Sequence, residues 1–408
     1  MKCRHCQSSL AHVFLDLGFA PPSNAYLTKE ELTSPETSFP LKLFVCDFCW
    51  LVQTEDYSAA DDLFSGDYAY FSSTSKSWLE HAARYAAAIT ERLDLTQDNF
   101  VIEVASNDGY LLKNFVAAGI PCLGIEPTDS TATASEKIGV PVLREFFGVA
   151  SANQLVATGR GADLICGNNV YAHVPDINDF TEGLRIALKA GGTINLEFPH
   201  LMRLIEKNQF DTVYHEHFSY LGLTTVSQIF ARAGLRIFDV EELTTHGGSL
   251  RIFGCHDADP RAPEPGVAEL IERERAFGLS DVNLYTDFQK QADRVKDDFV
   301  AFLIEQKRAG KSVAAYGAAA KGNTLMNYGG IRPDLIAFVC DAAPSKQGKF
   351  MPGSHIPILS PEEIALRKPD WVIILPWNIA GEVVQQLRDV RSWGGQFVVA
   401  VPELTVLP

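Results

Sequence analysis

The 408-residue chain is 46% hydrophobic and 21% charged, as in an ordinary globular protein of two or three domains. Its 35 basic and 51 acidic residues give a formal net charge of −16, which argues against a nucleic-acid partner because phosphate backbones bind basic surfaces. No apolar run is long enough to span a bilayer, and the first residues lead into a metal-binding motif rather than a signal peptide. We therefore expect a cytoplasmic protein without a membrane or nucleic-acid partner.

Residues 1–65 are predicted to form a small, loop-rich module that carries two CxxC motifs. Each motif presents two thiolates to one ion, and two motifs close a tetrahedral shell with no open position for water. The other four cysteines are scattered along the chain, and a reducing compartment disfavours disulfides. The alternatives are a coincidence of spacing or a redox CxxC. We predict a structural zinc ion with four ligands: Cys3, Cys6, Cys46 and Cys49.

A second unit, residues 66–260, is predicted to alternate strands with helices. Residues 76–93 place apolar side chains at helical spacing. Four apolar segments separated by helix-like stretches are typical of buried parallel strands: residues 100–104, 122–126, 164–167 and 193–198. This alternation predicts a doubly wound α/β fold.

The turn after the first of these strands has the character of a cofactor site. It is short and polar and precedes a helix, so backbone N–H groups and the helix N-terminus would face a ligand. Glu103 lies at the strand end, and Glu126 ends the next strand, where a carboxylate can accept hydrogen bonds from ribose hydroxyls. Two such acids without GxGxxG are similar to class I S-adenosylmethionine methyltransferases; a Rossmann turn that binds nothing is the alternative. The predicted cofactor residues are Glu103, Ala105, Ser106, Asn107, Gly109, Glu126 and Asn168.

Two histidine-bearing segments follow. His173 comes just past a strand end, where open α/β sheets bind ligands, although a lone histidine is more often structural. In Tyr214-His215-Glu216-His217, an extended backbone would place both histidines on one face and Glu216 on the other. A metal site there would lack a third ligand, and flanking aromatic residues argue against a surface histidine run. We favour acid/base chemistry with His217 as the base, while Tyr214 and Glu216 either orient it or contact the substrate.

A third unit, residues 261–408, is predicted after a proline-rich linker at residues 260–265. A charged amphipathic helix is expected at 282–309, followed by strands at 312–317, 335–340, 371–375 and 396–401. The small residues around Lys321 would let backbone approach a phosphate, and Asp341 ends the next strand, as a ribose-binding acid would. Arg251, after a Gly-Gly turn, would counter an anion or be structural. This unit therefore favours a nucleotide diphosphate, against a packing duplication without a ligand.

These motifs, in this order, resemble the zinc-containing, S-adenosylmethionine-dependent C-methyltransferases of deoxysugar biosynthesis, which methylate C3 or C5 of nucleotide-linked 4-keto-6-deoxysugars. The resemblance implies a three-part α/β architecture: an N-terminal zinc-binding module, a central class I methyltransferase domain and a smaller C-terminal Rossmann-like domain. Besides the paired CxxC motifs, it rests on six segments that span most of the chain: residues 67–73, 103–109, 168–170, 210–217, 246–251 and 375–378.

The resemblance also implies roles for residues. His217 would remove the proton beside the 4-keto group, and the enolate oxygen would need a donor such as Tyr68 or His173. The substrate would be a nucleotide-linked 4-keto-6-deoxysugar, with dTDP favoured over GDP, and the cofactors S-adenosylmethionine and structural Zn²⁺. An epimerase or isomerase that uses the same base and enolate is the main alternative; O-methyl transfer or a non-enzymatic scaffold would leave the histidine cluster with less to do. The predicted catalytic residues are His217, Tyr214, Glu216, His173 and Tyr68, and the predicted substrate-binding residues are Tyr70, Arg251, Lys321 and Asp341.

Overall fold

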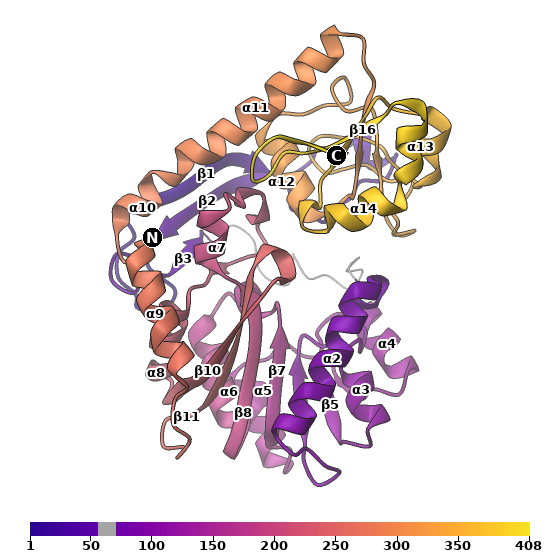
Figure 1. Cartoon of the computed structure of the whole chain (residues 1–408). Helices are drawn as coiled ribbons and strands as arrows, with labels where there is room; N and C mark the ends of the chain where they lie inside the picture. The colour runs from indigo at the N-terminus through magenta and orange to yellow at the C-terminus, as the bar shows by residue number, and fades with distance from the viewer. Residues whose placement is uncertain (56–70) are drawn as a thin grey trace.

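The computed structural model describes residues 1–55 and 71–408. Within them the strands form three sheets, of four, seven and six strands (Figure 1). Tyr68 and Tyr70 lie outside the described residues. None of the helices in the described ranges is long and apolar enough to cross a bilayer.

The four-stranded sheet is antiparallel and belongs mainly to the N-terminal module. Its strands are β1 (His12–Ala20), β2 (Phe39–Val45), β3 (Val52–Thr54) and β9 (Ser219–Tyr220), in that order. A short 3-10 turn, η1 (Glu31–Thr33), lies between β1 and β2. Strand β9 pairs with β3 although it follows it by more than a hundred residues. The segment that carries His217 is therefore attached directly to the sheet of the N-terminal module.

The seven-stranded sheet has the order β10-β11-β8-β7-β4-β5-β6. Five strands are parallel, and β10 and β11 form an antiparallel hairpin at the β8 edge. The four parallel strands predicted from the sequence are present. The seven strands are β4 (Val101–Val104), β5 (Cys122–Ile125), β6 (Val142–Leu143), β7 (Ala162–Asn168), β8 (Leu188–Pro199), β10 (Leu235–Leu243) and β11 (Ser249–His256).

Helices cover both faces of this sheet because successive strand residues point to opposite sides. Val101 packs with α2 and α3, whereas Ile102 packs with α5, α6 and α8. Helix α6 begins where the Asp176 side chain accepts two backbone N–H bonds, a cap that stabilises a helix by about 1 kcal/mol. The elements are η2 (Ser72–Thr74), α2 (Lys76–Arg92), α3 (Leu112–Ala117), α4 (Asp129–Lys137), α5 (Val149–Ala157), η3 (Tyr171–His173), α6 (Ile177–Ala187), α7 (Leu201–Glu206), η4 (Phe210–Thr212), α8 (Leu223–Arg232) and η5 (Thr245–Gly247).

The C-terminal sheet has the order β14-β13-β12-β15-β16-β17, and its last strand is antiparallel. Two helices differ from the expectation. The predicted helix at 282–309 is divided at Asp287, and the proline-rich run taken as a linker ends in a further helix, α9, which Pro265 begins. The elements are α9 (Pro265–Phe277), α10 (Val282–Thr286), α11 (Phe288–Arg308), β12 (Val313–Tyr316), α12 (Ala320–Tyr328), β13 (Val339–Cys340), β14 (Ile358–Leu359), α13 (Glu362–Arg367), β15 (Trp371–Ile374), η6 (Trp377–Ile379), α14 (Ala380–Gln386), η7 (Arg388–Trp393), β16 (Gln396–Val399) and β17 (Thr405–Leu407).

One hydrophobic core joins the N-terminal sheet to the C-terminal part. Helix α11 lies along β1 and leads into the C-terminal sheet (Figure 1). Phe14 of β1 stacks on Phe288 of α11 with ring centroids 4.9 Å apart, and it meets the edge of Tyr285 at 5.5 Å. The same core includes Phe210 and Val213, just before the histidine motif. Packing therefore holds the histidine motif between the N-terminal and C-terminal parts.

Candidate active site

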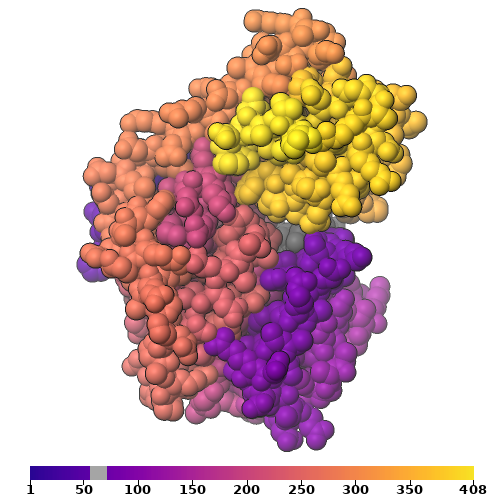
Figure 2. Space-filling model, in the orientation of Figure 1, coloured from indigo at the N-terminus to yellow at the C-terminus, as the bar shows by residue number. Residues whose placement is uncertain are grey.

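A cavity of about 610 Å³ lies at the carboxyl ends of β4, β5 and β7 and reaches the C-terminal part. Open α/β sheets bind ligands at this edge. Figure 2 shows the yellow C-terminal part seated directly above the violet residues of the central part. The wall includes Asn24 from the N-terminal module, Asn107 and Asn168 from the central sheet, and Lys321 and Lys346 from the C-terminal part. All three parts of the chain therefore contribute to one cavity.

The turn after β4, which the sequence predicts to bind the cofactor, is sharply curved and lines one end of this cavity, called the cofactor end below. Ala105, Asn107 and Gly109 have positive φ angles of 57°, 48° and 78°. The Asn107 N–H donates to Glu126 Oε2 at 2.9 Å, and Glu126 also accepts the Thr128 N–H at 3.0 Å. Glu126 thus holds the turn in place while its side chain also lines the cavity. Strained backbone of this kind collects at ligand sites.

Asn168 offers a free acceptor to a ligand. Its Nδ2 donates to the Tyr110 hydroxyl at 3.2 Å, and its Oδ1 is buried without a hydrogen-bond partner among the described residues. Tyr110 also interacts with Glu103, which is completely buried behind the cavity wall, and works to lower its pKa. Burial raises the pKa of Glu103 well above its usual range. Asn168 can therefore contact a cofactor directly, whereas Glu103 supports it through Tyr110.

Two other predicted cofactor residues shape the turn from behind and are not part of the cavity wall. A Cβ at Gly109 would lie 2.7 Å from Ser135 Oγ, so only glycine fits between the turn and α4. Ser106 packs against Gly124: a Cβ built at Gly124 would lie 2.2 Å from Ser106 Oγ. The cavity wall itself holds Ala105, Asn107, Glu126 and Asn168.

The histidine motif forms a tight turn instead of the extended segment expected. The His217 N–H donates to the Tyr214 carbonyl at 3.0 Å, which breaks the strand alternation. His215 consequently points to the carbonyls of Phe39 and Pro40 in the N-terminal sheet. Glu216 and His217 both line the cavity. The prediction that the two histidines share a face was wrong, because a turn-closing hydrogen bond separates them.

His217 carries the features of a free base. Its Nδ1 lies 3.2 Å from the Thr212 carbonyl oxygen, which can only accept, so Nδ1 bears the proton and Nε2 keeps its lone pair. Its ring centroid lies 4.1 Å from that of Tyr214 and 4.5 Å from that of His173. Burial, followed by repulsion from His173, lowers the pKa of His217 well below its usual range. Burial also lowers the pKa of His173 to about 4.

Glu216 and the two lysines complete the polar wall. Asn24 Nδ2 donates to Glu216 Oε1 at 2.7 Å. Lys321 Nζ donates to Asn378 Oδ1 at 2.7 Å, and Lys346 Nζ donates to the Ala318 carbonyl at the same distance. Burial lowers the pKa of both lysines, while nearby aspartates work in the opposite direction. A buried cation of this kind is stabilised by an anionic ligand.

Two predicted substrate residues lie outside the cavity wall. Asp341 is 3.7 Å from Lys346 and can act only through it. Arg251 pairs with the fully buried Glu197 at 2.7 Å and lies over the Tyr85 ring at 4.5 Å. Its guanidinium and His81 hold the pKa of Glu197 at about 2 against the effect of burial. Arg251 of β11 thus forms an ion pair with β8 and does not line the cavity.

Asn24, Trp78 and His246 are among the cavity residues that were not predicted from the sequence as site residues. His246 stood in the Gly-Gly turn before Arg251, and an unusual turn beside a sheet edge is a signal that could have identified it. Asn24 carries no such signal, because only the tertiary fold brings it to Glu216.

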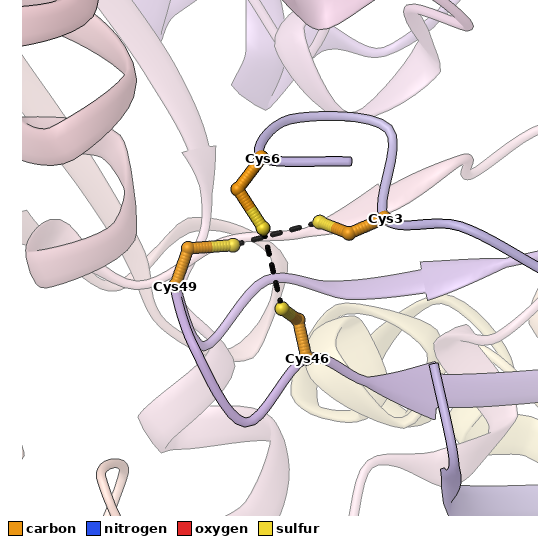
Figure 3. Close-up of side chains that lie close together, drawn as sticks. All are labelled: Cys3, Cys6, Cys46 and Cys49. Carbon is orange, nitrogen blue, oxygen red and sulfur yellow. Dashed lines mark hydrogen bonds between the residues drawn. The ribbon is translucent and has the colours of Figure 1, made fainter. Parts of the chain in front are cut away.

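The four CxxC cysteines come together as predicted. Their sulfur atoms all lie within 4.8 Å of one another, and the shortest distances, Cys3–Cys49 and Cys6–Cys46, are both 3.5 Å (Figure 3). Four thiolates on two facing turns form a closed tetrahedral donor set, which fits structural zinc. Asn178 of α6 donates to the carbonyls of Arg4 and His5, so the first turn is docked on the central domain.

The comparisons with known proteins agree with this arrangement. Residues 3–64 match the family described as "Putative zinc binding domain", residues 78–240 "Methyltransferase domain", and residues 244–402 "C-methyltransferase C-terminal domain". C-methyltransferase NovU of Streptomyces niveus is 35% identical over 407 residues, which cover 100% of this chain and 96% of that protein.

Solved structures match part of the chain at low identity. A methyltransferase of Clostridium acetobutylicum is 10% identical with a TM-score of 0.35, covering 43% of this chain and 91% of its own. Magnesium protoporphyrin IX methyltransferase of Synechocystis is 13% identical with a TM-score of 0.33, covering 43% and 77%. The full-length relative and the three matched domains establish that this chain belongs to the family of S-adenosylmethionine-dependent C-methyltransferases with an N-terminal zinc-binding domain.

Proposed function

We propose that this C-methyltransferase methylates the carbon beside the ketone, C3 or C5, of a nucleotide-linked 4-keto-6-deoxysugar, with dTDP favoured over GDP as the nucleotide. The observation that carries the proposal is the neutral His217, whose Nε2 lone pair is available in a cavity shared by the cofactor end and the C-terminal lysines. Methylation at carbon first requires removal of a C–H proton, and a neutral imidazole can accept it.

The residues around His217 suit this proton transfer. The ketone acidifies the adjacent C–H, and the proton would move to Nε2 while Nδ1–H remains on the Thr212 carbonyl. The imidazolium formed would be stabilised by that bond and by the Tyr214 ring, 4.1 Å away. Glu216, held by Asn24, would bind the sugar, and His173 or Tyr68 would donate to the enolate oxygen.

The cofactor end fits the methyl donor by its donor and acceptor groups. Asn168 Oδ1 is a buried acceptor that suits an ammonium group, and the Glu126 carboxylate suits ribose hydroxyls. When bound, S-adenosylmethionine supplies an electrophilic methyl group on a sulfonium sulfur. We assign Ala105 and Asn107 to the same wall, with Glu103, Ser106 and Gly109 supporting the turn from behind.

The nucleotide diphosphate would lie against the C-terminal part. Lys321 and Lys346 are the cations that line this side of the cavity, and an anion would relieve the depression of their pKa. Asp341 would orient Lys346, and Arg251 would act indirectly, through Glu197. Tyr70 is proposed as a further sugar contact from outside the described residues.

The test is to incubate the enzyme with S-adenosylmethionine and a panel of nucleotide 4-keto-6-deoxysugars in D2O, and to follow the products by NMR and mass spectrometry. A new carbon-bound methyl group is expected, at a position that the NMR spectrum identifies. Deuterium uptake beside the ketone without methylation would instead indicate the isomerase. No reaction with any member of the panel would contradict the proposed substrate class.

A further inference from the structure

His246 lies in a strained turn that lines the cavity. It belongs to η5, between β10 and β11, and has φ 52° and ψ 24°, a left-handed conformation that costs a side chain other than glycine roughly 1 kcal/mol or more. Gly247 follows, and a Cβ there would lie 2.5 Å from the Trp377 ring of the C-terminal part. Trp377 therefore packs closely against this turn and helps to stabilise the strained backbone.

The imidazole of His246 is held in a defined position. Asn169 Nδ2 lies 3.0 Å from its Nε2, and the Trp78 ring meets it edge-on at 5.4 Å. Asn169 is itself fixed by its N–H bond of 2.7 Å to the Glu197 carbonyl. Because the amide N–H donates to Nε2, the ring proton lies on Nδ1. His246 therefore offers an N–H donor beside the cavity.

His246 shares its surroundings with the proposed base and with the cavity lysine. Burial and then repulsion from Lys321 lower the pKa of His246 to about 4, so the ring is neutral near pH 7. His246 in turn contributes to the lowered pKa of His217. A neutral imidazole can polarise a carbonyl while keeping its own proton. The position and protonation of His246 suit an oxygen that gains negative charge.

We infer that His246 is a further catalytic residue, whose Nδ1–H donates a hydrogen bond to the substrate oxygen that becomes an enolate. The inference rests on the proposed function. The C–H proton moves to His217 Nε2, the electron pair of that bond delocalises onto the oxygen, and the proton of His246 stays on Nδ1. The enolate carbon then forms the new C–C bond as the C–S bond of the methyl donor breaks, with its electron pair left on sulfur.

The decisive variant is His246→Asn, because asparagine tolerates a left-handed backbone and lacks the imidazole donor at this position. Loss of one such donor lowers kcat by about 100-fold or more. We expect a comparable loss in the rate of C–H exchange into D2O, with the dissociation constant of S-adenosylmethionine unchanged. His355→Asn is the matched control, since His355 also has a positive φ of 57° but bonds Glu36, away from the cavity. It should behave like the unmodified enzyme.

Two kinetic outcomes would overturn the assignment. One is unchanged kcat and exchange in His246→Asn. The other is weaker binding of S-adenosylmethionine at unchanged kcat, which would make His246 a cofactor residue.

Nitrogen-15 NMR of the histidine rings in the ligand-free protein, with His246→Asn for assignment, provides a readout that needs no substrate. The neutral Nδ1–H form is expected near pH 7; the Nε2–H form or an imidazolium would contradict the inference. If the unmodified enzyme exchanges no proton of any 4-keto sugar, the proposed substrate fails, and the NMR result still decides the protonation of His246.

Discussion

The histidines in the cavity differ from exposed imidazoles in both charge and tautomer. Burial keeps His217 neutral, and the Thr212 carbonyl selects which nitrogen bears the proton. In His246, Asn169 donates to Nε2, so the proton is again on Nδ1, but here Nδ1–H is the group without a bond to Asn169. One ring is thus prepared to accept a proton and the other to donate a hydrogen bond. The partner of His217 is a neighbour in the chain, whereas the partner of His246 lies 77 residues away from it.

Replacing His217 with asparagine should remove most turnover. General-base catalysis contributes about 100-fold to 10,000-fold, and kcat and C–H exchange should fall by that order. Binding of S-adenosylmethionine, measured by calorimetry, should be retained because His217 lies outside the proposed cofactor wall. His215→Asn is a control on the same turn, since His215 faces the N-terminal sheet. Near-normal exchange in His217→Asn would remove it as the base.

The pH dependence should reflect the lowered pKa of His217. A lowered pKa means that protonation of the base begins only at more acidic pH, so its acid limb moves below the ordinary histidine value of 6.5. The value of kcat/KM, which reports the free enzyme, should therefore not decline through His217 between about pH 8 and about pH 6.5. A rate profile that shows an acid limb with its midpoint at or above the ordinary value would contradict this prediction.

At the scale of elements, the C-terminal part forms hydrogen bonds to residues 211–213, just before the histidine motif. Trp377 Nε1 of η6 donates to the buried Asp211 of η4 at 2.8 Å. Thr324 of α12 donates to the Val213 carbonyl at 2.7 Å. Burial raises the pKa of Asp211 to about 6, while Lys321 and the Trp377 bond work in the opposite direction. The position of His217 in this structure therefore depends on elements more than a hundred residues later in the chain.

Trp377→Phe should lower both kcat and the thermal stability. The substitution keeps an aromatic ring but leaves the buried Asp211 oxygen without its donor, which costs about 1–3 kcal/mol of stability. If the change displaces η4 and the same energy is lost from the transition state, kcat falls by about tenfold to hundredfold. Trp393→Phe is the control, because it removes a similar indole bond, 3.1 Å to the Pro369 carbonyl, away from the cavity. Thermal unfolding and kcat should be measured for both. Equal kcat in the two variants would contradict the coupling.

At the scale of the whole molecule, the zinc-binding module contributes to the wall of the candidate active site. Its Asn24 bonds Glu216, and the adjoining Tyr26 hydroxyl donates to the Ala318 carbonyl of the C-terminal part at 2.6 Å. Strand β9 and the shared core cross the proposed domain boundaries at residues 65 and 260. The three parts therefore meet in one packed unit around the cavity.

Cys46→Ser should lose zinc and, with it, activity. A module this small depends on its metal for folding, so removing one ligand should unfold it and release Asn24 from Glu216. Zinc content by mass spectrometry, the thermal midpoint and kcat should all fall. Cys122→Ser changes a buried thiol in β5, outside the module, and should keep its zinc. Full zinc content in Cys46→Ser would contradict the structural-zinc assignment.

Local patterns were enough to predict many of the elements. The four parallel strands are confirmed, because apolar segments separated by helix-like stretches leave few ways to bury them. The CxxC spacing similarly anticipated the four sulfur atoms of Figure 3, since each pair is set by one tight turn. Helix α9 was missed because its proline-rich start is equally typical of a linker.

The sequence by itself determined the class of fold and the four-cysteine cluster, and it predicted the cofactor turn, because each depends mainly on side chains close together in the chain. Only the tertiary structure decided that His215 leaves the cavity, that Arg251 pairs with Glu197, and that Asn24 and His246 enter the wall. These outcomes depend on contacts between segments far apart, and local propensity carries no information about such contacts until the core has brought the segments together.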